Sequence, residues 1–303
     1  MNSWLLFALL TPFFWGFSNA MDTAVRRHFL KSDLAATVFL AFTRLPLILA
    51  FFLIFPPVNL SWNAVLWMIF GGLIWMAPFI LYYRSMAFEE ASRVVLLLQL
   101  DSLFILIFAF FMIGERLSIG QIPAFILLLA GGVLAALKPS DHHGWRFSKA
   151  FIFMLLAGIS WSLSDVIFKK FAPAFPNFWS AFSWYLFGSF LIGPLSLLAK
   201  NIRHELKTIF SGVTQRGWFL LIINQISGLG GTMLFAYALT LGKASLTSVF
   251  LGVQPLFSFL WTLILPRMIP EVEREDTHRK ILFFKALAFI FIIGGLILLT
   301  NYG

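Results

Sequence analysis

Two charged residues lie in the middle of long apolar stretches. Arg44 falls in the run LAFTRLPLIL and Asp101 in the run LLLQLDSLFI. A charge at the centre of a bilayer costs about 2.5–3.5 kcal/mol on insertion scales, so such residues usually face a cavity or each other. Asp101 is therefore a candidate to bind a proton or a substrate ammonium group, and Arg44 to hold a carboxylate. The alternative is a buried structural ion pair between them.

Four further candidates occupy equivalent places near the ends of two apolar stretches. Asn19 and Asp165 each follow a tryptophan, Trp15 or Trp161, by one helical turn. All four are candidates to line the mouths of a substrate cavity. The alternative is an interfacial role, because Trp prefers the headgroup region and Asp165 has Lys169 four residues later as a partner.

Uncharged amide side chains also occur within the apolar stretches. Each can bind a substrate or join two helices, and interhelical polar contacts contribute about 0.6 kcal/mol on average. Both interpretations stay open for Gln99, Asn224, Gln225 and Gln254.

The elements that position these residues are predicted to be membrane helices. Hydrophobic residues make up 60% of the chain and charged residues 12%, whereas soluble domains carry about 25% charged residues. The apolar residues form blocks near the ~20 residues that cross a bilayer, and backbone groups in lipid must pair within a helix. The ten expected spans are 3–21, 34–55, 62–83, 92–113, 119–138, 149–168, 178–199, 217–239, 245–265 and 281–300. Five prolines inside them are expected to kink helices: Pro46, Pro78, Pro123, Pro194 and Pro255.

The net charge of +9 does not indicate nucleic-acid binding, because the basic residues lie mostly in loops, where they orient helices. Sixteen Lys and Arg residues fall in the joints after odd-numbered spans and four in the others. The positive-inside rule then places both termini outside. The expected location is a cell inner (plasma) membrane. With no Cys and all five His residues in predicted loops, no metal site or cofactor is expected.

The chain repeats itself at half-length. The run from Ala91 to Gln99 has a second copy that begins at Ala244, 153 residues later, and Trp15 matches Trp161. Each half holds five spans, an odd number, so the halves must cross the membrane in opposite senses. The sequence therefore predicts an all-α protein of two inverted five-helix repeats, at 1–140 and 148–303, with the substrate near the midplane.

These features resemble the EamA-type drug/metabolite transporter superfamily over nearly the whole chain. The resemblance rests on the ten spans, Trp15-Gly16, the Ala91-Ser92 run and Gly114-Glu115-Arg116-Leu117. It implies a secondary transporter with spans one to four and six to nine around a central cavity. Members export amino acids and other metabolites, and relatives carry nucleotide sugars, phosphorylated sugars or cationic drugs. This chain departs from the family in three ways. Its second half has Leu265-Pro266-Arg267 in place of the Gly-Glu pair, and the proline frequent in the family's fourth span is Ser102 in the first half and is kept only as Pro255 in the second. Many members also have cytoplasmic termini, which differs from the orientation that the charges predict here.

Other classes fit less well. An intramembrane hydrolase would need a buried His partner, and the five His residues of this chain fall in predicted loops. Asp101 and Asp165 are expected at different depths, so we do not expect them to share a proton. A non-transporting subunit does not need mid-membrane charges in a duplicated bundle. Small multidrug relatives use a Glu in their first span, and Ser3–Asn19 has no acidic residue. Nucleotide sugars require several basic residues for phosphate, and Arg44 alone is weak support.

We therefore expect a non-enzymatic secondary active transporter that exports small polar or zwitterionic metabolites, amino acids among them, by alternating access. Its partners are a small-molecule substrate, the lipid bilayer and protons as the candidate coupling ion, without nucleic acid. Proton-coupled efflux of cationic drugs, with Asp101 as the acidic group, is the alternative.

Overall fold

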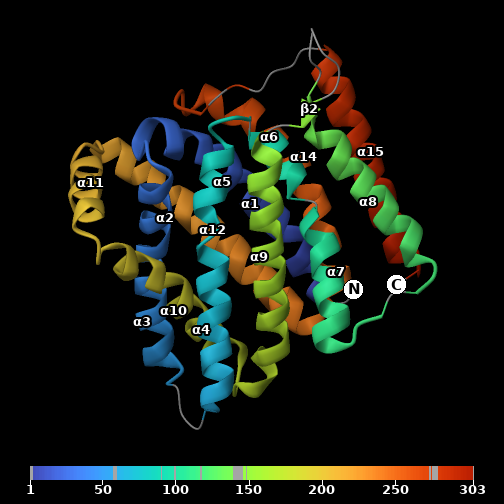
Figure 1. The fold of residues 1–303 in the computed structure, drawn as a ribbon, viewed down its shortest axis with the longest axis horizontal. Coiled ribbons are helices and arrows are strands. Elements are labelled where there is room, and N and C mark those ends of the chain that lie inside the picture. The colour runs from blue at the N-terminus through green and yellow to red at the C-terminus, as the bar shows by residue number, and fades with distance from the viewer. Residues whose placement is uncertain are drawn as a thin grey trace.

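The computed structural model describes residues 3–56, 60–89, 91–98, 100–116, 118–138, 146–147, 149–272, 274 and 279–302, and they are almost wholly helical (Figure 1). The first half contains α1 (Ser3–Ala24), α2 (Asp33–Phe42), α3 (Leu45–Ile54), α4 (Trp62–Met76), α5 (Phe79–Ser85), α6 (Ala91–Leu97), α7 (Leu100–Ile113) and α8 (Gln121–Ala136). The second half contains α9 (Lys149–Phe171), α10 (Phe178–Ser196), α11 (Lys200–Ser211), α12 (Gln215–Leu241), α13 (Ala244–Val249), α14 (Gln254–Ile264) and α15 (Arg279–Tyr302). A π-helical turn, Val25–Phe29, extends α1, and 3₁₀ turns follow α9, α13 and α14. Two residue pairs, β1 (Leu137–Lys138) and β2 (Arg146–Phe147), form an antiparallel ladder.

Every predicted span overlaps one or two of these helices. Among the described residues, seven helical segments are long and apolar enough to cross a membrane, or eight if the bent α10–α11 pair is one span. The expected multi-pass helical protein is therefore confirmed, whereas the expected number of ten spans is not confirmed by the described residues. The α8 helix, with 16 residues, falls below the usual spanning length.

Prolines break three of the spans. Pro46 lies at the start of α3, Pro78 precedes α5, and Pro255 is the second residue of α14. Proline has no amide hydrogen for the preceding turn and clashes with it, so the helix stops and restarts there. Pro194, in contrast, stays inside α10. The breaks expose side chains and backbone to the interior of the bundle, which is where membrane transporters place their substrate sites.

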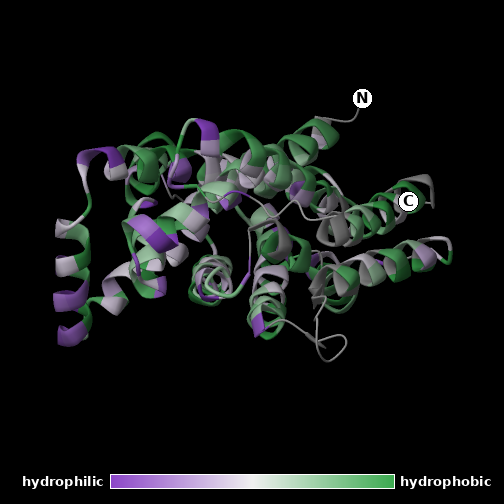
Figure 2. Ribbon diagram, turned by 90° about the horizontal axis from the view of Figure 1, so that it is seen from above, coloured by the Kyte–Doolittle hydropathy of each residue, from purple (hydrophilic) through white to green (hydrophobic). Residues whose placement is uncertain are grey.

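Much of the surface of the bundle is apolar, and several charged side chains are buried inside it, the reverse of a soluble protein. Leu53 is 84% exposed and Phe111 77%, whereas Arg44 is 1% exposed. In Figure 2 hydrophobic residues follow most helices, and α11 alternates between hydrophilic and hydrophobic turns. Exposed apolar surface of this extent is suited to contact with lipid.

Helices from the two halves pack against each other throughout the bundle. The α1 helix lies against α12 and α14, α4 against α10, and α7 against α9. The helices α4 and α10 approach each other closely at two glycines. A Cβ added at Gly72 would overlap the Tyr185 carbonyl oxygen, and one added at Gly188 would overlap the Ile69 carbonyl oxygen. The last helices of the halves, α8 and α15, pair along one edge (Figure 1).

Candidate functional site

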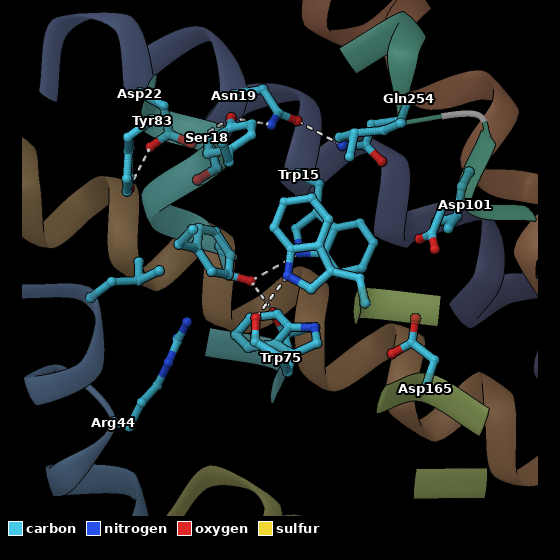
Figure 3. Close-up of a pocket in the computed structure, with 18 residues that line it drawn as sticks. Trp15, Ser18, Asn19, Asp22, Arg44, Trp75, Tyr83, Asp101, Asp165 and Gln254 are labelled. Carbon is cyan, nitrogen blue, oxygen red and sulfur yellow. Dashed lines mark hydrogen bonds between the residues drawn. The ribbon is translucent and has the colours of Figure 1, made fainter. Parts of the chain in front are cut away.

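A cavity lies between the halves, and seven of the ten residues singled out in the sequence line it. Its walls come from α1, α2, α4, α5, α7, α9, α12 and α14 and from the breaks between them. The predicted residues that reach it are Trp15, Asn19, Arg44, Asp101, Trp161, Asp165 and Gln254. The cavity is the place where helix breaks and buried charges coincide (Figure 3).

Of the other three predicted residues, Asn224 and Gln225 do not line the cavity. Asn224 is buried and its side-chain amide donates to Asp22 Oδ1 at 2.7 Å. Gln225 Oε1 accepts a hydrogen bond from Thr43 Oγ1 at 3.3 Å, which joins α12 to the end of α2. Both therefore link helices. Gln99 lies outside the described residues.

Asp101 and Asp165 face each other across the cavity. Asp101 is the second residue of α7, and Asp165 lies on α9, one turn after Trp161. Both side chains line the same cavity, and Figure 3 shows their carboxylates pointing toward one another. They were expected at different depths, but Asp101 lies near the start of α7, just after a helix break, and lines the same cavity as Asp165. Ser162 Oγ donates to the Asp101 carboxylate and to its carbonyl oxygen.

Arg44 occupies another part of the cavity and has no anionic partner among the described residues. It is the residue before α3, at the break with α2. Its Nε and Nη1 atoms are buried without a hydrogen-bond partner among the described residues. Its guanidinium carbon lies 5.3 Å from the centroid of the Trp75 ring. The alternative of an Arg44–Asp101 ion pair is not observed in the described part of the chain.

Trp15 and Trp161 line the cavity. Trp15 Nε1 donates to the Gly228 carbonyl oxygen at 3.2 Å, and Trp161 Nε1 to that of Trp75 at 2.7 Å. Phe79 packs edge-on against Trp75 and Trp161, with centroids 5.1 and 5.2 Å away. With their N–H groups bonded to backbone, the indoles present ring faces and edges to the cavity.

Asp22 is a cavity residue that the sequence reasoning missed. The sequence predicts that the first span ends at residue 21, whereas α1 continues through Asp22 to Ala24. The expectation that the first span has no acidic residue is therefore wrong. A signal was present: Trp15, Ser18, Asn19 and Asp22 follow the i, i+3, i+4, i+7 spacing of one helix face.

A hydrogen-bond network centred on Asp22 ties the two halves together. Asp22 accepts from Tyr82 Oη at 2.8 Å, Tyr83 Oη at 3.4 Å and Asn224 Nδ2 at 2.7 Å. Asn19 Nδ2 donates to Tyr82 Oη at 2.6 Å and Asn19 Oδ1 accepts from Gln254 Nε2 at 2.7 Å. We call these six residues the Asp22 latch. They connect α1 and α5 of the first half with α12 and α14 of the second.

A second set of contacts joins the halves at the other end of α1. Glu115 accepts from the backbone N–H groups of Ala244 and Ser245 at 3.0 and 3.2 Å, and from Ser245 Oγ. Lys169 Nζ lies 3.7 Å from Glu115 Oε1 and donates to the Leu239 carbonyl oxygen. Lys169 thus pairs with Glu115 and not with Asp165. We call these residues the Glu115 latch.

The two latches are far apart. Lys169 also donates to the Gly242 carbonyl oxygen, and Gly242 contacts Trp4 near the start of α1. Asp22 lies 18 residues farther along the same helix, which corresponds to roughly 27 Å at 1.5 Å per residue. The aspartates and Arg44 therefore lie in a cavity whose walls are joined at both ends of α1.

Comparison with known proteins gives three findings. Residues 2–137 and 148–272 match the sequence model of the EamA-like transporter family. Two proteins called CMP-sialic acid transporter 2, from Oryza sativa subsp. indica and subsp. japonica, are each 28% identical over 198 residues, covering 59% of this chain and 51% of the relative. The chain thus spans about half the length of the curated relatives it matches. A solved crystal structure aligns over 97% of this chain and 96% of its own with a TM-score of 0.59 and 18% identity, a likeness of fold.

Proposed function

Because the chain belongs to the EamA-like transporter family, we propose that it is a secondary active transporter that exports small zwitterionic metabolites by alternating access. The observation that carries the proposal is the chemistry of the cavity. It combines three carboxylates, one guanidinium and several aromatic rings between the two halves of the chain. A molecule with one cationic and one anionic group can satisfy both kinds of charge, and the rings can pack on its apolar body.

The proposed architecture is two inverted five-helix repeats, 1–140 and 148–303. Equivalent helices of each half support it, because Trp15 on α1 and Trp161 on α9 both line the cavity and both donate to a backbone carbonyl. The pairing of α8 with α15 also relates the last helix of one half to that of the other. Rocking of one half against the other would then open the cavity to each side in turn.

Nucleotide sugars fit this cavity less well than amines do. The printed name of the two relatives indicates a CMP-linked sugar, which brings a phosphate and a carboxylate. A phosphate is usually held by several Arg or Lys residues. Among the described residues that line the cavity, Arg44 is the one basic residue. Asp22, Asp101 and Asp165 would repel such an anion. We therefore place the substrate among molecules that carry an ammonium group.

The alternative is efflux of cationic drugs with protons as the coupling ion. The acidic residues and aromatic rings favour it, because cations bind both carboxylates and ring faces. It differs from the main proposal in one respect: a purely cationic substrate leaves Arg44 without an anion.

Transport by the purified full-length protein in lipid vesicles tests the proposal. Vesicles loaded with a mixture of unlabelled amino acids and amines would be diluted into radiolabelled members of each class. We expect exchange of zwitterions that is lost in Asp101→Asn. Glu271→Gln, which removes an exposed pair with Arg216, is the matched control and should exchange normally. Exchange of CMP-linked sugars without exchange of any amine would refute the proposal.

A further inference from the structure

We propose that the cavity binds a zwitterion whose ammonium and carboxylate groups lie at opposite ends of the molecule, with Arg44 as the carboxylate anchor. This inference rests on the transport function proposed above. It adds a class of substrate: ω-amino acids and similar elongated molecules, as distinct from α-amino acids, which carry both charges on one carbon.

The first step concerns Arg44. A buried guanidinium needs an anion or several hydrogen-bond acceptors, because an unpaired buried charge is strongly destabilising. Arg44 is 1% exposed, and its Nε and Nη1 atoms have no acceptor among the described residues. The Trp75 ring, 5.3 Å away, supplies a cation–π contact on one side only. The guanidinium fork thus remains free for a carboxylate, the group whose geometry it matches.

The second step concerns the carboxylate pair. The Asp101 carboxylate accepts from Ser162 Oγ, whereas Asp165 has no hydrogen-bond donor among the described residues. Two facing carboxylates repel each other unless a cation or a proton lies between them. An ammonium group has three N–H donors and no acceptor. It can therefore donate to both aspartates at once, which a neutral amide or hydroxyl cannot do as well.

The third step concerns what lies between the two charged groups. Figure 3 shows Arg44 on one side of Trp75 and the two aspartates on the other. No ion pair joins Arg44 to a carboxylate in the described part of the chain, although all of these residues line one cavity. Trp75 lies between the two charged groups, and Phe79, which also lines the cavity, packs edge to face against both Trp75 and Trp161. A substrate that reaches both ends therefore needs an apolar body between its charges.

Isomers give a sharp test of this arrangement. Exchange in vesicles would be measured for ε-aminocaproate and its isomer norleucine, and for γ-aminobutyrate and its isomer α-aminobutyrate. The members of each pair have the same atoms and net charge and differ in charge separation. We expect the ω-isomer of at least one pair to be preferred by about ten-fold or more in kcat/KM. The α-isomer cannot place its carboxylate at Arg44 and its ammonium group at the two aspartates at the same time.

Variants of Arg44 assign the carboxylate end. Arg44→Gln should raise the KM for ε-aminocaproate by about ten-fold or more and leave the KM for n-hexylamine, which has no carboxylate, nearly unchanged. Arg44→Lys keeps the charge and should recover part of the loss. Arg216→Gln, which removes an exposed guanidinium paired with Glu271, is the matched control. Thermal unfolding of each variant in detergent reports whether the fold is kept.

The outcomes separate the inference from the function on which it rests. Equal or better exchange of the α-isomers would overturn the inference and leave zwitterion transport intact. An equal loss for ε-aminocaproate and n-hexylamine in folded Arg44→Gln would show that Arg44 supports the cavity and does not bind carboxylate. If neither amino acids nor amines exchange, both the inference and the proposed function fail.

Discussion

Asp101 and Asp165 supply two carboxylates to one buried site, and this has a consequence for proton coupling. A proton and a substrate ammonium group both relieve their repulsion, so each should displace the other. Lowering the pH should then raise the KM for an ammonium-bearing substrate. In the described part of the chain, no basic residue forms an ion pair with either aspartate. Protons and the substrate ammonium group should therefore compete directly for the pair.

The prediction at this scale is that Asp165→Asn weakens the pH dependence of the KM. An asparagine cannot take up a proton, and the remaining Asp101 no longer faces a like charge. Exchange would be measured across a range of pH in wild-type and variant vesicles, with Glu271→Gln as the control. A pH profile in Asp165→Asn equal to that of the wild type would rule out the pair as the coupling site. The fold should persist, because Asp165 accepts no hydrogen bond from the described residues.

Single residues were partly predictable from the sequence. A charge inside a long apolar run is visible without coordinates, and Arg44 and Asp101 were found in this way. Trp15 and Trp161 were found because they occupy matching places in the two halves. Asp22 was not, because it lies where a span was expected to end, and only the length of α1 brings it into the cavity. The hydrogen-bond partners of Asp22 lie on two other helices, α5 and α12, and no spacing in the sequence indicates which helices meet.

At the scale of helices, the contact of α4 with α10 depends on glycine. At Gly72 a Cβ atom would overlap a backbone carbonyl, which cannot rotate away as a side chain can. We predict that Gly72→Ala destabilises the protein by about 1–3 kcal/mol, the usual effect of overpacking. The midpoint of denaturation in detergent would measure this.

The control for that prediction is the same substitution in a helix with room. At Gly230, on α12, an added Cβ would lie 3.8 Å from Phe14, an ordinary contact. Gly230→Ala should be neutral or gain up to about 1 kcal/mol from helix propensity. Equal destabilisation by both substitutions would show that the loss comes from helix flexibility and not from the α4–α10 contact.

Helix breaks were the most predictable elements. Proline inside an apolar run marked the breaks that place Arg44 before α3 and Gln254 at the start of α14. The break between α6 and α7 lies just before Asp101. The sequence has Ser102 there, where a proline would have predicted the break. Its position depends on packing against α9, and tertiary contacts of this kind are absent from local sequence.

For the whole molecule, the two latches suggest how access to the cavity alternates. Each joins the first half of the chain to the second, and they lie near opposite ends of α1. In both, one carboxylate accepts several hydrogen bonds through its two oxygens. An amide has one oxygen, so Asp22→Asn or Glu115→Gln leaves donors without an acceptor, at about 1–3 kcal/mol for each group left unsatisfied. Weakening one latch should favour the state that is open at that end.

We therefore predict that these two variants shift accessibility in opposite directions. The chain has no Cys, so Ser18→Cys, on the cavity wall, introduces a single thiol. Its reaction with a membrane-impermeant reagent would be measured from each side of vesicles in turn. A change of about 1.4 kcal/mol in the equilibrium alters the labelling rate up to about ten-fold. Asp22→Asn should speed labelling from one side and Glu115→Gln from the other. If both speed it from the same side, the latches do not alternate, and the cavity opens by a movement that these contacts do not control.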